Sequence, residues 1–411
     1  MSTHAAADTT AASVDVPAGA DGDAAWAAAT RAVLAQADAK LARRFDGGEI
    51  VDKLVALRTR AVDEVIRAGW QRCIPADAGL ALFAVGGYGR GELFPHSDID
   101  LLVLADGDVQ QAQQPALARF LALLWDAGLQ ASQAVRSPAQ CTEASADQTV
   151  LTALIEARPL VAGEAAQQGL RDAVSPERVW PARAFFEAKA REQAQRHARF
   201  GDTSDNLEPN LKDGPGGLRD LHTLGWMALR SFGVRELDPL VGLDHLGADE
   251  AVALDRERRA LGRLRFGLHL VAGRREERLR FDFQKLLAER LGYADDGDSL
   301  AVEKMMQGFY RSAAIVRRIN DRLLQRFEEH FDGAAEPQAL DDDLELRRGY
   351  LATRKPGWLL EDTANVFALF AAWAADTSLR GLHSQTAREL ARALPGIQEY
   401  AKASPALREA F

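Results

Sequence analysis

Residues 85–102 read VGGYGRGELFPHSDIDLL, and this stretch is the most informative part of the chain. Gly86 and Gly87 follow a short apolar run and let the backbone turn sharply, which leaves bare N–H groups at the turn. A helix expected at about 88–93 points its positive N-terminal end in the same direction. The glycine turn is therefore predicted to receive a phosphate group.

Two aspartates stand at the other end of the same stretch. Ten residues separate Gly87 from Asp98. Side chains alternate along a strand, so Asp98 and Asp100 are expected to project on the same face. Two carboxylates aimed at one point need a cation between them, and hard oxygen ligands beside a phosphate favour Mg²⁺. The pattern predicts a metal site that binds a nucleoside triphosphate.

The segments around this stretch indicate a sheet with helices. Apolar runs predict strands at 80–85, 99–104 and 129–135. Helical spacing of apolar residues predicts a helix at 112–126 and two more within 24–70. Strands alternating with helices over so short a distance indicate an α/β arrangement. Residues 1–23 have the composition of a disordered tail.

Beyond residue 147 the apolar spacing is helical almost throughout, with a loop where prolines and glycines interrupt it at 201–217. The expected helices lie at 181–200, 217–232, 249–271, 278–291 and 299–331. The fold class expected is α+β. It comprises a sheet domain at 24–160, an all-helical domain at 161–331, and a small helical unit or linker at 332–411.

The spacing of the glycine pair and the Asp-apolar-Asp motif resembles the signature of the polymerase-β-like nucleotidyltransferase superfamily. The longer string GGYGRGELFPHSDIDLL, at 86–102, resembles the N-terminal part of the bacterial bifunctional PII uridylyltransferase/uridylyl-removing enzymes. A second string, NLKDGPGGLRDL at 210–221, resembles another segment of that family and is followed by Trp226. The resemblance extends over roughly 49–331.

This resemblance implies transfer of UMP from UTP to a tyrosine of the PII nitrogen-regulatory protein, with release of pyrophosphate. Asp98 and Asp100 would be the catalytic ligands of Mg²⁺. The nucleotide would be bound by Gly86, Gly87, Arg90, Ser97, Lys212 and Arg219. Two alternatives stay open: a nucleotidyltransferase that uses another nucleotide or acceptor, and a catalytically inactive nucleotide-binding regulatory module.

The sequence departs from the superfamily pattern in one respect. Members usually carry a third carboxylate on a neighbouring strand, but residues 129–136 read LQASQAVR and contain no acid. Ser132-Gln133-Ala134 stands where family members commonly have Gly-His-Ser. The candidates for the missing carboxylate are Asp147 and Glu156, with Asp213 and Asp220 further along the chain.

Composition excludes some classes of function. The formal net charge of -10 disfavours a protein that grips the phosphate backbone of nucleic acids. There is no signal-peptide pattern and no run of about 18 apolar residues, and the two cysteines form no metal motif. We therefore expect a soluble cytoplasmic protein without membrane contact. The arginines between 256 and 280 suit either a docking surface for an acidic partner or a solvated face, and the acids that alternate with them favour the solvated face.

The bifunctional family also carries an HD-type phosphohydrolase domain and two ACT domains. None of the eight histidines of this chain is followed by Asp, as an HD site requires. The 80 residues after Phe331 are also too few for an HD domain and two ACT domains, so these domains are expected to be absent, and with them the removal of UMP and the response to glutamine.

Overall fold

The computed structural model describes residues 21–333 and 336–403. The disordered tail expected at 1–23 lies outside these residues, apart from its last three, and the first helix begins at Asp23. Among the described residues, none of the helices has the length and apolar character that a membrane span requires.

The described chain forms two compact units. One consists of the residues up to Arg235 together with Asp255–Ile315, and the other of Glu236–Leu254 together with the chain from Val316 onward. Two long helices, α12 (Ala248–Ala272) and α14 (Ala301–Asp332), contribute residues to both units.

The first unit is built around a four-stranded sheet with the order β3-β2-β1-β4. β1 pairs antiparallel with β2 and β4, and β2 pairs in parallel with β3. A parallel pair needs a crossover connection, which two helices between β2 and β3 supply. These elements are β1 (Ala81–Ala84), β2 (Ile99–Leu104), α4 (Gly107–Ala112), α5 (Gln114–Asp126), β3 (Ala131–Arg136) and β4 (Arg158–Val161).

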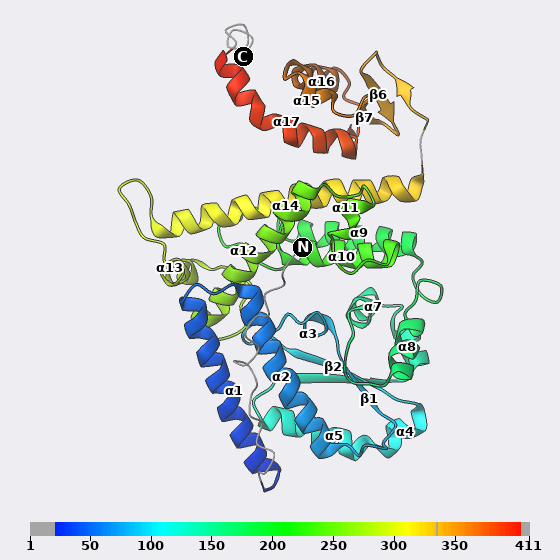
Figure 1. The fold of residues 1–411 in the computed structure, drawn as a ribbon, viewed down its shortest axis with the longest axis vertical. Helices are drawn as coiled ribbons and strands as arrows, with labels where there is room; N and C mark the ends of the chain where they lie inside the picture. Colours follow the sequence, from blue (N-terminus) through cyan, green and yellow to red (C-terminus); the bar gives the residue numbers. More distant parts are fainter. Residues whose placement is uncertain (1–20, 334–335, 404–411) are drawn as a thin grey trace, which may run out of the picture. The chain divides into compact units, whose positions relative to one another are not determined.

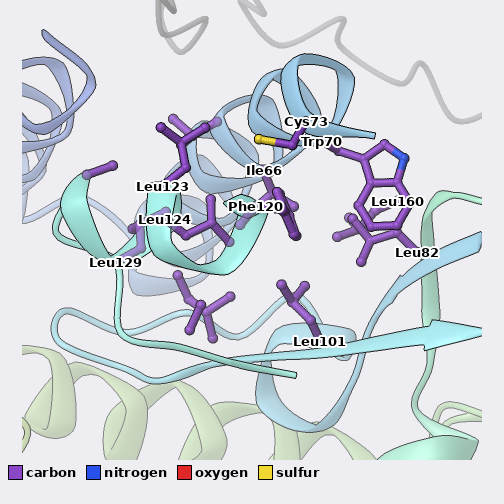
Figure 2. Close-up of a cluster of buried hydrophobic side chains, with 14 of the residues drawn as sticks. Ile66, Trp70, Cys73, Leu82, Leu101, Phe120, Leu123, Leu124, Leu129 and Leu160 are labelled. Atoms are coloured by element: carbon purple, nitrogen blue, oxygen red, sulfur yellow. The ribbon is translucent and has the colours of Figure 1, made fainter. Parts of the chain in front are cut away.

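Helices cover both faces of this sheet (Figure 1). On one face Leu82 and Leu101 belong to a core with side chains of α2 and α5 (Figure 2). On the other face Phe83 and Leu102 belong to a second core with side chains of α7 and α8. Because both faces are buried, β1 is apolar throughout and β2 is apolar apart from Asp100, as in the interior of a two-sided sheet. The helices concerned are α2 (Val51–Cys73), α7 (Gln148–Ile155) and α8 (Glu164–Ala173).

The helices expected from the sequence are present, but the segment after β1 differs. The helix expected at 88–93 is a single turn, α3 (Gly86–Gly89), because Gly91 has a φ of 77° in the left-handed region that ends helices. β4 was not expected either, since it is four residues long and contains Pro159. The other helices of this unit are α1 (Asp23–Asp46), α6 (Pro138–Ala144), α9 (Ala182–Ala198), α10 (Leu218–Phe232) and α13 (Phe281–Arg290).

The second unit contains a second four-stranded sheet, with the order β5-β6-β7-β8. The expectation of a small helical unit or linker at 332–411 is therefore wrong. The strands have only two to four residues each, too few to show an alternating pattern in the sequence. The elements are α11 (Pro239–Gly242), β5 (Gln338–Ala339), β6 (Leu344–Arg347), β7 (Tyr350–Thr353), α15 (Trp358–Glu361), α16 (Ala364–Ala375), β8 (Gly381–Leu382) and α17 (Ser384–Ala403).

Candidate active site

A cleft in the first unit gathers most of the residues that the sequence singles out. Its lining comes from the glycine turn, the start of β2, helix α7 and the helical segments that follow the sheet. Asp98, Asp100 and all six candidates for nucleotide binding line it. The lining residues are Gly86, Gly87, Arg90, Glu92, Leu93, Ser97, Asp98, Asp100, Thr149, Thr152, Ala153, Glu156, Lys212, Arg219, Trp226, Arg265 and Arg275.

The glycine turn depends on glycine at two positions. Gly86 has a φ of 58°, in the left-handed region that favours glycine. A β-carbon on Gly89 would collide with the carbonyl oxygen of Glu156. The N–H of Gly89 donates a hydrogen bond to the carbonyl of Val85 at 3.0 Å, so the amides of Gly86 and Gly87 precede the first closed turn. Because α3 is a single turn, a phosphate here would depend on these amides and on nearby cations, and not on the dipole of a longer helix.

Asp98 immediately precedes β2, Asp100 is the second residue of this strand, and both line the cleft. Asp98 forms an ion pair with Arg275, and its side chain is 43% exposed. Asp100 accepts a hydrogen bond from Ser132 Oγ at 2.8 Å, across the parallel pair of β2 and β3. The neighbouring strand thus offers Asp100 a hydroxyl group and not a third carboxylate.

Arg90 connects the glycine turn to α7. Its Nη1 lies 2.7 Å from both carboxylate oxygens of Glu156, and its Nε lies 2.8 Å from Glu92. The indole N–H of Trp226, on α10, also donates to Glu156. Burial alone would lower the pKa of Arg90, but the charges of Glu92 and Glu156 raise it. Glu156 therefore lines the cleft, but its carboxylate is engaged by Arg90 and Trp226.

His222 completes this buried network from α10. Its Nε2 lies 3.1 Å from Glu92. Burial and the charge of Arg90 lower the pKa of His222 to about 3, so the imidazole is neutral at physiological pH. Burial alone would raise the pKa of Glu92, but the charge of Arg90 holds it well below its usual range. Arg90 is thus a fixed cation behind the glycine turn.

The remaining candidates for a third carboxylate do not join the pair. Asp147 caps α7, where it accepts a backbone N–H at 2.7 Å, and it does not line the cleft. Asp220 is fully buried and forms an ion pair of 2.6 Å with Arg196. Within residues 21–333 and 336–403, no group of three or more His, Cys, Asp or Glu side chains is arranged to hold a metal ion. Among the described residues, none of Asp147, Glu156, Asp213 and Asp220 therefore forms a metal-binding group with Asp98 and Asp100.

The second glycine-rich string forms a loop that leads into α10 and places Lys212 and Arg219 in the cleft. Asn210 Oδ1 shapes the loop by accepting the backbone N–H groups of Lys212, at 3.0 Å, and of Asp213, at 2.7 Å. Gly216 has a φ of 75°, and a β-carbon there would collide with the backbone of α14. Only glycine fits this position, which explains the Pro-Gly-Gly sequence at the turn.

The helical segments give the cleft its positive charge. Burial, together with the charges of Arg265 and Arg219, lowers the pKa of Lys212 to about 8. The guanidinium of Arg219 lies over the ring of Trp226, 5.3 Å from its centroid. Arg265 donates to Glu277 at 2.8 Å. Cations from the helical segments and carboxylates from the sheet thus line one cleft, as a metal-bound polyphosphate would require.

Two family models match the chain. The model described as "Nucleotidyltransferase domain" matches residues 70–158, and the model described as "GlnD PII-uridylyltransferase" matches residues 184–324. Curated proteins named bifunctional uridylyltransferase/uridylyl-removing enzyme are also similar to it. The protein of Xanthomonas campestris pv. campestris (strain 8004) is 64% identical over 393 residues, 96% of this chain and 45% of the relative. The protein of Azotobacter vinelandii is 42% identical over 352 residues, 84% of this chain and 39% of the relative.

The chain belongs to this enzyme family. It spans less than half the length of these relatives. Residues from both matched segments line the cleft. Nucleotidyltransferase domains generally use a divalent metal. Asp98 and Asp100 fit such an ion, because a small hard cation is commonly held by one or two carboxylates together with substrate phosphates and water.

Sequence reasoning missed Arg265 and Arg275. Both lie in a stretch of alternating charges, which predicts a solvated face, yet both line the cleft. The interpretation is correct for Arg258 and Arg259 of the same stretch, which are partly exposed and pair with Asp52. Arg265 differs in being 8% exposed. No feature of one sequence separates an arginine aimed at the cleft from one aimed at solvent.

Proposed function

We propose that this chain transfers UMP from UTP to a tyrosine of the PII nitrogen-regulatory protein, with Mg²⁺ as the metal. The name of the relatives and the description of the matching family model support the nucleotide and the acceptor. The observation that carries the proposal is that Asp98 and Asp100 line the same cleft as the glycine turn and the cations of the helical segments.

The reaction is a displacement at the α-phosphorus of UTP. The phenolic oxygen of the acceptor forms a bond to this phosphorus, and the bond from the phosphorus to the oxygen that bridges to the β-phosphate breaks. Pyrophosphate leaves with that electron pair, roughly in line with the attacking oxygen, and the phenolic proton passes to water. When bound, Mg²⁺ would stabilise the charge on the attacking and leaving oxygens.

The chain's own groups would position the triphosphate. Backbone amides of Gly86 and Gly87 can donate to phosphate oxygens at the turn. Lys212 and Arg219, which line the same cleft, would offset the charge that moves onto the leaving pyrophosphate. Ser97 adds a hydroxyl group to the lining. This division leaves the carboxylates for the metal and the cations for the phosphates.

The two ranges that line the cleft are proposed to have different roles, in a protein located in the cytoplasm. We assign residues 24–160 to catalysis and residues 161–331 to closing over the nucleotide and receiving PII, since residues from both ranges line the cleft. A cytoplasmic location is supported by Cys73 and Cys141, which are both buried and free. Free thiols are the state that a reducing compartment maintains.

The test is transfer of label from UTP to purified PII in the presence of Mg²⁺. Asp98→Asn and Asp100→Asn keep the side-chain volume but remove the charge that holds the metal, so transfer should fall by at least about a hundredfold. Asp106→Asn is the matched control, because Asp106 is exposed beyond the end of β2 and does not line the cleft. Transfer within about tenfold of the unaltered chain in either test variant would refute the assignment.

The two alternatives predict different results in the same assay. A transferase for another nucleotide would label an acceptor from ATP, GTP or CTP and not from UTP. An inactive regulatory module would bind a nucleotide without releasing pyrophosphate.

A further inference from the structure

A second hollow in the first unit is also lined by Asp98 and Asp100. The rest of its lining is Trp125, at the end of α5, and residues 128–132, which lead into β3. The two aspartates are the only residues that its lining shares with the cleft described above. The carboxylates therefore lie between two different surfaces.

The sheet topology places these surfaces on opposite flanks of the carboxylates. β2 lies between β1 and β3 in the sheet. The end of β1, which leads into the glycine turn, pairs with the start of β2 on one side, and the start of β3 pairs with it on the other. A β-carbon on Gly86 would lie 3.5 Å from Asp100 Oδ2, whereas Ser132 Oγ donates to Asp100 Oδ1 at 2.8 Å. Each oxygen of Asp100 thus faces one flank.

The two surfaces also differ in charge. Among the residues that the structure describes, five cationic side chains line the cleft, whereas no lysine or arginine lines the hollow. A polyphosphate therefore suits the cleft and not the hollow. The hollow instead offers uncharged groups and the ring of Trp125 beside the two carboxylates.

Trp125 is placed to contact a ligand. Its side chain is 58% exposed, which is unusual for so large an aromatic residue. Its indole N–H donates a hydrogen bond to the carbonyl oxygen of Ala131 at 2.7 Å, which fixes the ring at the rim of the hollow. A fixed, exposed ring can stack on a second aromatic ring with little loss of side-chain entropy.

We propose that this hollow receives the acceptor tyrosine, with Trp125 as the surface against which the tyrosine ring stacks. This inference rests on the proposed function. In a displacement at phosphorus the attacking and leaving oxygens lie roughly in line, on opposite sides of the reacting atom. The cations that suit the leaving pyrophosphate are all in the cleft. The phenolic oxygen must therefore arrive from the flank of Asp98 and Asp100 where Trp125 lies.

The test compares Trp125→Ala with Trp125→Phe and Trp373→Ala in steady-state transfer of UMP. Trp125→Ala should raise the KM for PII about tenfold, the loss expected for one aromatic contact, and leave the KM for UTP within about twofold. Trp125→Phe keeps a ring and should restore most of the affinity for PII. Trp373 is also an exposed tryptophan, but it lies outside residues 24–331 and lines neither surface, so Trp373→Ala should change neither KM.

A second measurement uses direct binding. PII should bind Trp125→Ala more weakly than the unaltered chain in the presence of Mg²⁺ and a UTP analogue that cannot react between its α- and β-phosphates. Thermal unfolding checks that each variant is folded. Its midpoint should stay close to that of the unaltered chain, because the substituted side chains are exposed.

The outcomes separate this inference from the proposed function. An unchanged KM for PII in Trp125→Ala, with transfer intact in the unaltered chain, would overturn the inference alone. A raised KM for UTP with an unchanged KM for PII would assign the hollow to the nucleotide base and also overturn it. An equal rise of the KM for PII in Trp373→Ala would show that the effect is not specific to Trp125 and would also overturn the inference. Absence of transfer by the unaltered chain would overturn the proposed function, and this inference with it.

Discussion

The protonation of Lys212 should make nucleotide binding depend on pH. Burial, with Arg265 and Arg219 nearby, lowers the pKa of this lysine to about 8. The free protein therefore carries the charge at pH 7 but has largely lost it at pH 9. A bound triphosphate places negative charge beside the ammonium and favours its protonated form. Binding above pH 8 must then take up a proton, which weakens the apparent affinity.

The size of the effect follows from the pKa of Lys212. With a value of about 8, roughly nine tenths of Lys212 is protonated at pH 7 and roughly one tenth at pH 9. If the bound form stays protonated throughout, the Kd for UTP should rise about tenfold between these two pH values. His222 does not contribute in this range, because its pKa is about 3. The charges of Glu92 and Glu156 raise the pKa of Arg90, so this arginine stays charged.

Isothermal titration calorimetry measures both effects. The Kd for UTP with Mg²⁺ is determined at pH 7, 8 and 9, and buffers of different ionisation enthalpy report the number of protons taken up. Lys212→Arg is the matched control, since arginine keeps its charge at all three values and should give a flat profile. Equal affinity at pH 7 and pH 9 in the unaltered chain would refute the reasoning. So would the same loss of affinity in Lys212→Arg.

Three further changes test the packing around the site. Gly89→Ala places a β-carbon against the carbonyl oxygen of Glu156, so the free energy of unfolding, measured with heat or urea, should fall by about 1–3 kcal/mol. An unchanged unfolding midpoint would contradict the close packing. Asp220→Ala leaves Arg196 buried without its ion-pair partner, so the free energy of unfolding should fall by about 3–5 kcal/mol in the same assay. A decrease of less than about 1 kcal/mol would show that the fold does not depend on this pair. Gly87→Val should keep the fold, because a β-carbon there has no contact closer than 3.6 Å. Its branched methyl groups should crowd the phosphate approach and weaken UTP binding, and an unchanged Kd in the folded variant would place the phosphates elsewhere.

The strands that carry the carboxylates could be predicted because both faces of the sheet are buried. β2 matches the predicted range 99–104, since its residues other than Asp100 are all apolar. The second sheet could not be predicted, because strands of two to four residues leave no pattern. A contact such as that between Arg90 and Glu156 joins positions 66 residues apart. Such a pairing depends on how α7 packs beside the glycine turn, which no local pattern records.

For the same reason, the sequence could not show whether any of the candidates completes the site as a third carboxylate. Glu156 is one of the acids nearest to the aspartates in sequence, and it does line the cleft. Its carboxylate, however, accepts hydrogen bonds from Arg90 and Trp226. Asp98 in turn pairs with Arg275. A divalent cation would therefore be bound by the carboxylates of Asp98 and Asp100, and the ion pair between Asp98 and Arg275 would have to break first. The remaining ligands would have to come from phosphate oxygens and water, as is usual for Mg²⁺. Such a site favours binding of the metal together with the nucleotide. The metal needs phosphate oxygens to complete its ligands, and the phosphates need the metal to offset their charge beside the two carboxylates.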